Sequence, residues 1–178
     1  MSKSTIARKN LGENLGENLS KGLGAGALLV ALSLAGTASY AAVSPFRAMA
    51  GSWSGGGTIS MADGQQERLR CRASYDVDDS GVELHLNLRC ASESYNFDLA
   101  SNVEYRGGAV SGEWTEASRN ASGTLEGRAA GDRIEVAATG QSFSANLSLT
   151  THGNRQTVSI RPAEGTEIRA VSLALERR

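Results

Sequence analysis

From Gly51 onward, apolar and polar residues alternate with a period of two, and turn residues interrupt this alternation roughly every eight to twelve positions. No stretch of this region shows a 3.6-residue apolar period, and no proline occurs between Gly51 and Pro162. The pattern therefore predicts about ten consecutive antiparallel strands joined by short turns. The first strand is expected over Gly51–Met61 and the last over Glu167–Glu176.

The two cysteines of the chain indicate the register of one predicted hairpin. If a turn closes at Asp79–Val82, Cys71 faces Cys90 and Val77 faces Leu84, with the apolar side chains on one face. This register predicts a Cys71–Cys90 disulfide, a bond typical of oxidising compartments. Counting outward from later turns predicts further pairs: Cys90 with Phe97, Leu88 with Leu99, Tyr105 with Val110, Ser101 with Trp114, Trp114 with Leu125, Ala129 with Ile134, Val136 with Ala145, Ile134 with Leu147 and Leu149 with Val158.

The last predicted strand changes its phase. Ile168 is at an even position, whereas the later apolar residues from Val171 are at odd positions, so a β-bulge is expected near Arg169. A ten-stranded sheet with one apolar face must cover that face, which favours closure into an up-and-down barrel, with a two-sheet sandwich as the alternative.

The opposite face of the predicted strands is charged. Its members are Arg68, Arg70, Arg72, Glu83, His85, Arg89, Glu104, Glu113, Glu126, Arg128, Arg133 and Glu135. A barrel that spans a membrane needs an apolar band on its outside. The pattern therefore predicts a water-soluble all-β barrel, with its charged face toward solvent and its apolar face turned inward.

The first forty or so residues have the features of an export signal. Lys3, Arg8 and Lys9 precede an apolar stretch over residues 23–35, and small residues at 39 and 41 suit cleavage before Ala42. The predicted organisation is a signal peptide over 1–41, an N-terminal segment over 42–50 and a single barrel domain over 51–178. A retained transmembrane anchor is the weaker alternative. The expected location is the periplasm of a Gram-negative bacterium or the extracellular space.

The charge of the chain gives no support for two classes of partner. The chain has 18 Lys and Arg against 19 Asp and Glu, and residues 1–41 hold four of the basic and two of the acidic side chains. The remaining part is mildly acidic, with charges of both signs mixed along it. We therefore expect no binding to nucleic acid and no attraction to anionic membranes.

Little in the sequence indicates catalysis. The cysteines are expected to be oxidised, the two histidines His85 and His152 fall on the predicted surface, and no nucleophile elbow, metalloprotease motif or phosphate loop occurs. The protein is therefore expected not to be an enzyme and to use no cofactor. Haem ligation through Tyr75 would lack an inward histidine as a second ligand.

One turn has part of the pattern of a calcium loop. Acidic and hydroxyl residues over 76–81 have suitable spacing, but the twelfth position is Asn87 in place of glutamate. We therefore expect a solvated acidic turn and no metal site.

Gly51-Ser52-Trp53 resembles the Gly-x-Trp opening of the lipocalin-like (calycin) barrels. In that superfamily a late arginine packs on the tryptophan, and Arg155, Arg161 and Arg169 are candidates here. The resemblance implies binding of a small apolar ligand inside the barrel. The chain is also similar to small secreted barrels that inhibit metalloproteases, which carry an early tryptophan and one short-loop disulfide.

The inward face predicts where a ligand would bind. Five aromatic residues are expected on it: Trp53, Tyr75, Phe97, Trp114 and Phe143. Small residues are also expected on it: Gly55, Gly57, Gly112, Gly127, Ala129, Ala138 and Ala145. The large residues are concentrated on strands one to five and the small ones on strands five to eight. Either the barrel flattens into a solid core, or it stays round and leaves an apolar cavity for a hydrophobic molecule.

The exterior offers a second candidate site. Arg70, Arg72 and Arg89 form a predicted basic cluster, with Arg68 in the same row. The cluster either docks an acidic partner or envelope polymer, or is neutralised by neighbouring acids such as Glu83 or Asp98.

The leading functional hypothesis is a carrier of a small hydrophobic ligand. The alternative is an interaction module, either a protease inhibitor or an envelope scaffold. Such a module would act through its exterior and through the N-terminal segment Ala42–Ala50.

Overall fold

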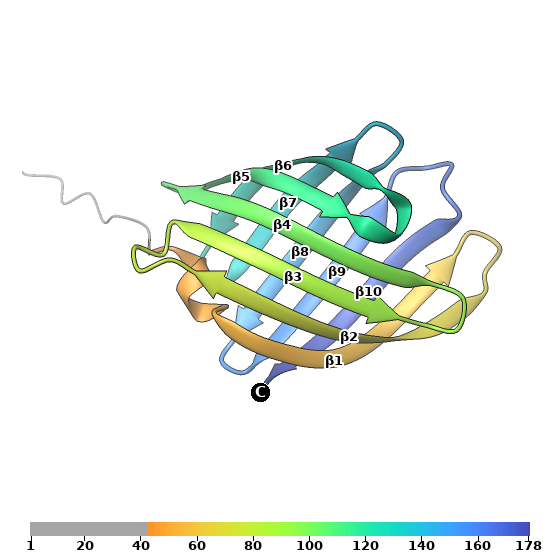
Figure 1. The fold of residues 1–178 in the computed structure, drawn as a ribbon, viewed down its shortest axis with the longest axis horizontal. Helices are drawn as coiled ribbons and strands as arrows, with labels where there is room; N and C mark the ends of the chain where they lie inside the picture. Colours follow the sequence, from red (N-terminus) through yellow and green to blue (C-terminus); the bar gives the residue numbers. More distant parts are fainter. Residues whose placement is uncertain (1–42) are drawn as a thin grey trace, which may run out of the picture. The chain divides into compact units, whose positions relative to one another are not determined.

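The computed structural model describes residues 43–178, and the predicted signal peptide lies outside the described residues. Ten antiparallel strands each pair with the next, and β10 pairs with β1, so the sheet is a closed barrel and not a sandwich (Figure 1). The strands are β1 (Gly51–Met61), β2 (Gln66–Val77), β3 (Glu83–Ala91), β4 (Asn96–Arg106), β5 (Ala109–Glu116), β6 (Ala121–Ala130), β7 (Arg133–Gly140), β8 (Ser144–His152), β9 (Arg155–Pro162) and β10 (Ile168–Arg177). Within residues 43–178, two short 3₁₀ helices accompany them, η1 (Pro45–Ala48) and η2 (Ala117–Arg119).

Most of the predicted hairpin registers are confirmed. Cys71 faces Cys90 between β2 and β3, and their Cα atoms lie 4.1 Å apart across a disulfide. The predicted pairs between β3 and β4, β4 and β5, β6 and β7, and β8 and β9 are also present. The alternation therefore places each of these side chains on its predicted face.

Two predicted registers are wrong by two residues. Trp114 faces Gly123 in place of Leu125, because η2 widens the connection between β5 and β6. Val136 faces Leu147 in place of Ala145, and Ile134 consequently faces Leu149 and not Leu147. A shift of two residues leaves the inward face inward, so the hydrophobic pattern alone does not separate such registers.

The predicted bulge in the last strand is confirmed. Ser60 pairs with Ala170 and Met61 with Ile168, so the β1–β10 ladder skips Arg169. The bulge brings the even position of Ile168 and the odd positions that follow onto one inward face.

One end of the barrel is closed by the N-terminal segment. Ser44 caps η1 by accepting a hydrogen bond from the Phe46 amide at 3.2 Å, and the side chains of Phe46 and Met49 are buried. The Phe46 ring meets the Tyr105 ring edge-on at 6.0 Å between centroids. We call residues 44–50 the plug.

Trp53 and Arg177 hold the plug through hydrogen bonds to its backbone carbonyls. The Trp53 indole donates from Nε1 to the Met49 carbonyl at 2.7 Å, and Arg177 donates to the carbonyls of Ala48 and Ala50. The Arg177 guanidinium also lies over the Trp53 ring, 4.4 Å from its centroid.

The late arginine on the tryptophan is therefore Arg177, and the three predicted candidates are wrong. Arg155, Arg161 and Arg169 are exposed on the outside of the barrel. The inward odd positions of β10 run on from Val171 to Arg177, which is the direct partner of Trp53. Continuing that alternation by one step is the signal that identifies Arg177.

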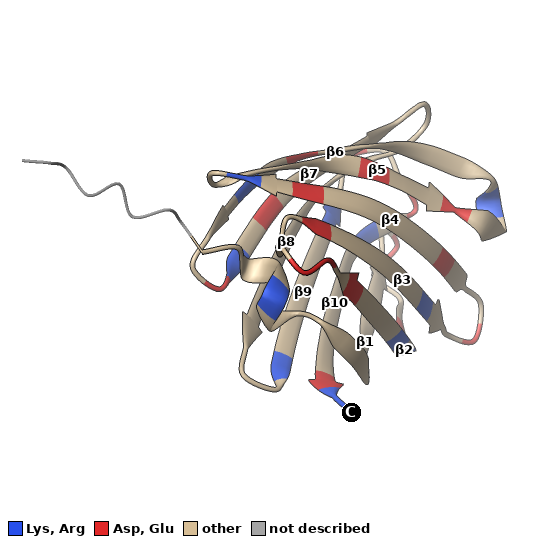
Figure 2. Cartoon of the chain, turned by 60° about the vertical axis from the view of Figure 1, so that its left-hand side comes forward, with Lys and Arg blue, Asp and Glu red and all other residues tan. Residues whose placement is uncertain are grey.

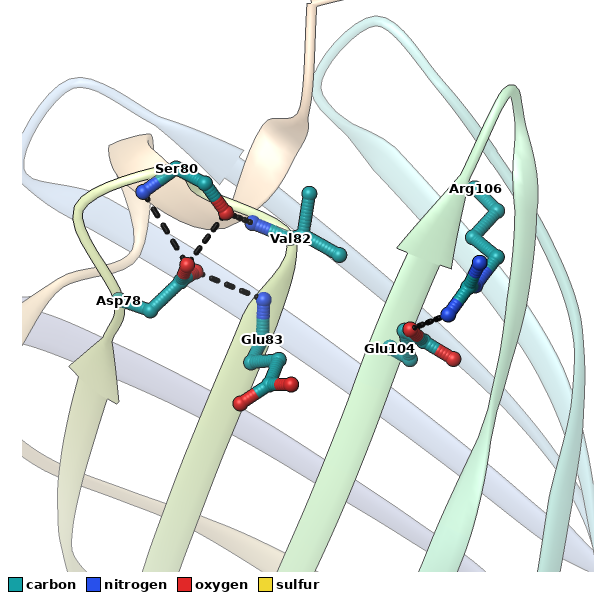
Figure 3. Close-up of polar contacts among 6 residues, drawn as sticks. All are labelled: Asp78, Ser80, Val82, Glu83, Glu104 and Arg106. Carbon is teal, nitrogen blue, oxygen red and sulfur yellow. Dashed lines mark hydrogen bonds and ion pairs between the residues drawn. The ribbon is translucent and has the colours of Figure 1, made fainter.

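The acidic turn before β3 is held by its own groups. The Asp78 carboxylate accepts hydrogen bonds from the Ser80 hydroxyl, the Ser80 amide at 3.1 Å and the Glu83 amide at 2.8 Å (Figure 3). The Ser80 hydroxyl first, and then the Glu83 amide, lower the pKa of Asp78 to about 2. The Asp78 carboxylate thus stabilises the turn itself, which agrees with the predicted solvated acidic turn. Figure 3 also shows the Glu104–Arg106 ion pair on the neighbouring strand.

The outer face carries most of the charged side chains. Acidic and basic positions are interspersed over the strands in the view of Figure 2. His85 faces Asp76 and contacts Asn102 through Nδ1 at 2.6 Å, and His152 is exposed 3.6 Å from Asp132. Within residues 43–178, no helix is both long enough and apolar enough to cross a membrane.

Candidate ligand cavity

The barrel encloses a cavity of about 430 Å³. Its wall is largely aliphatic, formed by residues such as Leu69, Leu88, Leu125, Val136, Leu149 and Ile160. The volume falls within the range of about 300–1,000 Å³ that is typical of small-molecule sites. Of the two arrangements that the sequence leaves open, the structure has the barrel with a cavity.

The cavity extends from the plug to the opposite end of the barrel. Phe46 and Met49 line it at the plug end and are buried. At the other end the lining includes Arg119 and Ser142, which are exposed. The cavity therefore reaches the surface among the turns at that end, which we call the mouth.

Four of the five predicted aromatic residues line the cavity. These are Tyr75, Phe97, Trp114 and Phe143, and they come from β2, β4, β5 and the turn before β8. Trp53 is not part of the lining, because it is buried beneath the plug against Arg177 and makes a T-shaped contact with the Tyr75 ring. Whether the four residues bind a ligand stays a prediction.

Tyr75 belongs to a buried polar chain at the plug end. Its hydroxyl donates to Gln156 Oε1 at 2.6 Å, and Gln156 donates from Nε2 to the Thr151 hydroxyl at 3.1 Å. Burial raises the pKa of Tyr75, and the hydrogen bond to Gln156 opposes that rise only in part. The phenol therefore stays neutral and is held by a satisfied network.

Glycines give the wall space for the largest ring. Trp114 faces Gly123, and Gly123 in turn faces Gly140 on the next strand. A Cβ atom placed on Gly140 would lie 3.0 Å from Cζ2 of the Trp114 indole, so a larger residue there would press on the ring. The Trp114 ring also meets Phe143 edge-on at 5.8 Å.

Glu116 organises the mouth. It is buried, and its carboxylate accepts hydrogen bonds from the amides of Asp98 at 2.9 Å, Ser118 at 3.2 Å and Arg119 at 2.8 Å. Burial works to raise the pKa of Glu116, but these donors outweigh it and hold the pKa below its ordinary value. The carboxylate thus fixes the turn at η2 as an anion.

Arg119 completes this arrangement. Its Nη1 lies 3.6 Å from Glu116 Oε2 and donates to the Asn96 carbonyl at 3.1 Å. The guanidinium lies 4.8 Å from the centroid of the Phe97 ring. Neither Glu116 nor Arg119 was identified from the sequence, because their roles depend on η2, a turn whose register the alternation does not specify.

The basic cluster on the exterior is partly neutralised. Arg72 faces Arg89 as predicted, and Arg89 forms an ion pair with Asp98 on the next strand at 3.2 Å. Glu83 lies at the far end of β3 and takes no part. Arg70 and Arg72 are exposed beside this pair, and docking of an acidic partner on them stays a prediction.

Comparison with known proteins adds information on the fold. No family model and no curated protein matches the chain. The solved structure of Rv2717c from M. tuberculosis aligns with a TM-score of 0.60 at 15% identity, over 77% of this chain and 99% of that one. The S-type phycobiliprotein lyase CPES from Guillardia theta aligns with a TM-score of 0.50 at 12% identity, over 75% and 89% of the two chains. At these identities the likeness shows the fold alone, a closed antiparallel barrel of ten strands.

Proposed function

We propose that this protein binds a small apolar molecule inside its barrel. The observation that carries the proposal is the cavity of about 430 Å³ with an aliphatic and aromatic wall that reaches the surface at the mouth. Transfer of an apolar molecule from water into such a wall is favourable by about 25 cal/mol for each Å² buried. No polar group of the ligand is needed for this driving force.

The lining favours binding over catalysis. Among the described residues, the titratable side chains of the lining are Tyr75, Glu116 and Arg119. Tyr75 is held by Gln156, and Glu116 and Arg119 hold η2. Each is already engaged in a structural hydrogen bond or ion pair, so we propose a carrier and not an enzyme.

We place this carrier in the periplasm or outside the cell. The support comes from the predicted signal peptide and from the Cys71–Cys90 disulfide, because such bonds persist in oxidising compartments. Detection of the protein in a periplasmic or culture-medium fraction, with residues 1–41 removed, tests this location.

The plug argues against the inhibitor alternative. An inhibitor of that kind would insert its N-terminal segment into a target cleft, yet Phe46 and Met49 are buried in their own barrel. Arg177 and Trp53 also hold the backbone of the segment. Insertion would require the plug to be withdrawn, at the expense of these contacts.

A matched pair of variants, in each of which one alanine is replaced by leucine, tests the proposal. Ala138 is buried and lines the cavity, whereas Ala137 is exposed on the outside of the same strand. Ala138→Leu fills part of the cavity, and the crowding is expected to weaken binding of the apolar fluorescent probe N-phenyl-1-naphthylamine by roughly five- to a hundredfold. Ala137→Leu is expected to leave binding unchanged.

Native mass spectrometry of protein purified from its own host provides a second measurement. We expect a co-purified apolar mass that Ala138→Leu diminishes. A wild-type protein that binds no probe and carries no extra mass would contradict the proposed function.

A further inference from the structure

The Trp114 indole has a polar atom with no partner. Its side chain is buried, and among the described residues its Nε1 atom has no hydrogen-bond partner. The other tryptophan differs, since Trp53 donates from Nε1 to the Met49 carbonyl. A buried N–H group without an acceptor is destabilising, and such groups are few in folded proteins. Trp114 lines the cavity, so an occupant of the cavity is the available source of an acceptor.

Two polar side chains close to Trp114, Ser101 and Glu116, already make hydrogen bonds of their own. Ser101 faces Trp114 across the β4–β5 ladder, and its hydroxyl donates to the Glu113 carbonyl at 2.9 Å. The Glu116 carboxylate, two residues along the strand, accepts from three backbone amides. Of these three side chains, Trp114 is the one whose donor hydrogen is left for a ligand.

The charge at the mouth indicates what kind of acceptor fits. The one cationic side chain among the described lining residues is Arg119, which is paired with Glu116. A carboxylate head group in the cavity would lose its water without gaining an unpaired cation, which is costly. A neutral carbonyl oxygen loses less on leaving water and needs a single donor.

We propose that the ligand carries an uncharged carbonyl group, as in a ketone, ester or amide, on an apolar body, and that this oxygen accepts a hydrogen bond from Trp114 Nε1. The inference rests on the proposed function and specifies the chemical class of its ligand. Neighbouring atoms shield Nε1 in the structure. The proposed hydrogen bond therefore requires the indole to rotate until Nε1 faces the cavity.

Three probes of equal chain length test this assignment: undecane, 2-undecanone and undecanoate. Each competes with N-phenyl-1-naphthylamine for wild type and for Trp114→Phe, which keeps an aromatic ring and removes the donor. Loss of the donor is expected to weaken 2-undecanone about three- to tenfold more than undecane. Undecanoate at neutral pH is expected to bind more weakly than the ketone.

A measurement on the wild-type protein is independent of whether the variant folds. In a nitrogen-15 NMR spectrum, the indole N–H signal of Trp114 is expected to move downfield with 2-undecanone and not with undecane. The Trp53 signal serves as the internal control, since that indole is already bonded to Met49.

The possible failures are distinguishable. If neither N-phenyl-1-naphthylamine nor any of the three compounds binds and the purified protein carries no extra mass, the proposed function itself is wrong. If undecane and the ketone bind but Trp114→Phe weakens both equally and the indole signal stays in place, the carbonyl assignment is wrong while the carrier function stands. Tighter binding of undecanoate than of the ketone would overturn the uncharged head group.

Discussion

Removal of the Arg177 guanidinium is expected to loosen the plug. In Arg177→Met the apolar stem remains, but two hydrogen bonds to the Ala48 and Ala50 carbonyls and the contact over the Trp53 ring are lost. The two bonds lie at the rim, one exposed and one partly buried, so each is worth about 0.5–1 kcal/mol net. The cation–π contact adds roughly 0.5–1 kcal/mol. The free energy of unfolding should therefore fall by about 2 kcal/mol.

Urea unfolding followed by circular dichroism measures this loss. Hydrogen exchange of the Met49 amide, which donates to the Phe46 carbonyl at 2.8 Å, reports on the plug alone and should accelerate in the variant. Arg177→Lys is the matched control: it keeps the charge but not the planar fork, so we expect about half of the loss.

A double-mutant cycle with Trp53→Phe isolates the ring contact. The coupling free energy between the two positions should be about 0.5–1 kcal/mol. If Arg177→Met costs less than about 0.5 kcal/mol and leaves exchange at Met49 unchanged, the reasoning is refuted. The plug would then be held by the packing of Phe46 and Met49 alone.

Two further predictions concern the disulfide and the mouth. Replacing Cys71 and Cys90 together by alanine opens a loop of 19 residues' separation and should lower the free energy of unfolding by about 3 kcal/mol, and an unchanged urea midpoint would contradict this. Glu116→Gln should lower it by about 1 kcal/mol at pH 7, because the amide offers fewer acceptors to three backbone N–H groups. The folded-state pKa of Glu116 is below its ordinary value of 4.5, so the carboxylate stabilises the fold above that pH and loses its effect as the pH falls through the folded pKa. The difference in the free energy of unfolding between wild type and Glu116→Gln should therefore be smaller at pH 3 than at pH 7. A difference that is independent of pH would exclude this stabilising role of the Glu116 carboxylate.

The sequence by itself determined which side chains face inward and most of the hairpin registers. Both follow from local rules: the two-residue alternation assigns a face, and a short turn such as that before Glu83 leaves one register for its hairpin. The Cys71–Cys90 pairing, the first strand and the bulge at Arg169 are confirmed for this reason. Where the turn is longer, as at η2, two registers of equal parity compete, and the capping of η2 by Glu116 decides between them.

Only the tertiary structure decided the contents of the barrel. Alternation along the last strand places Arg177 on the inward face, but its contact with Trp53 forms because the sheet closes on itself. No local pattern pairs two residues so far apart in the chain. The plug reached its place in the same way, since Phe46 has no strand partner that would reveal its position. The cavity is the part of the interior volume of the closed barrel that the inward side chains do not fill. Alternation says which side chains point inward but not how far apart opposite walls stand, because that distance is set by the closure of all ten strands.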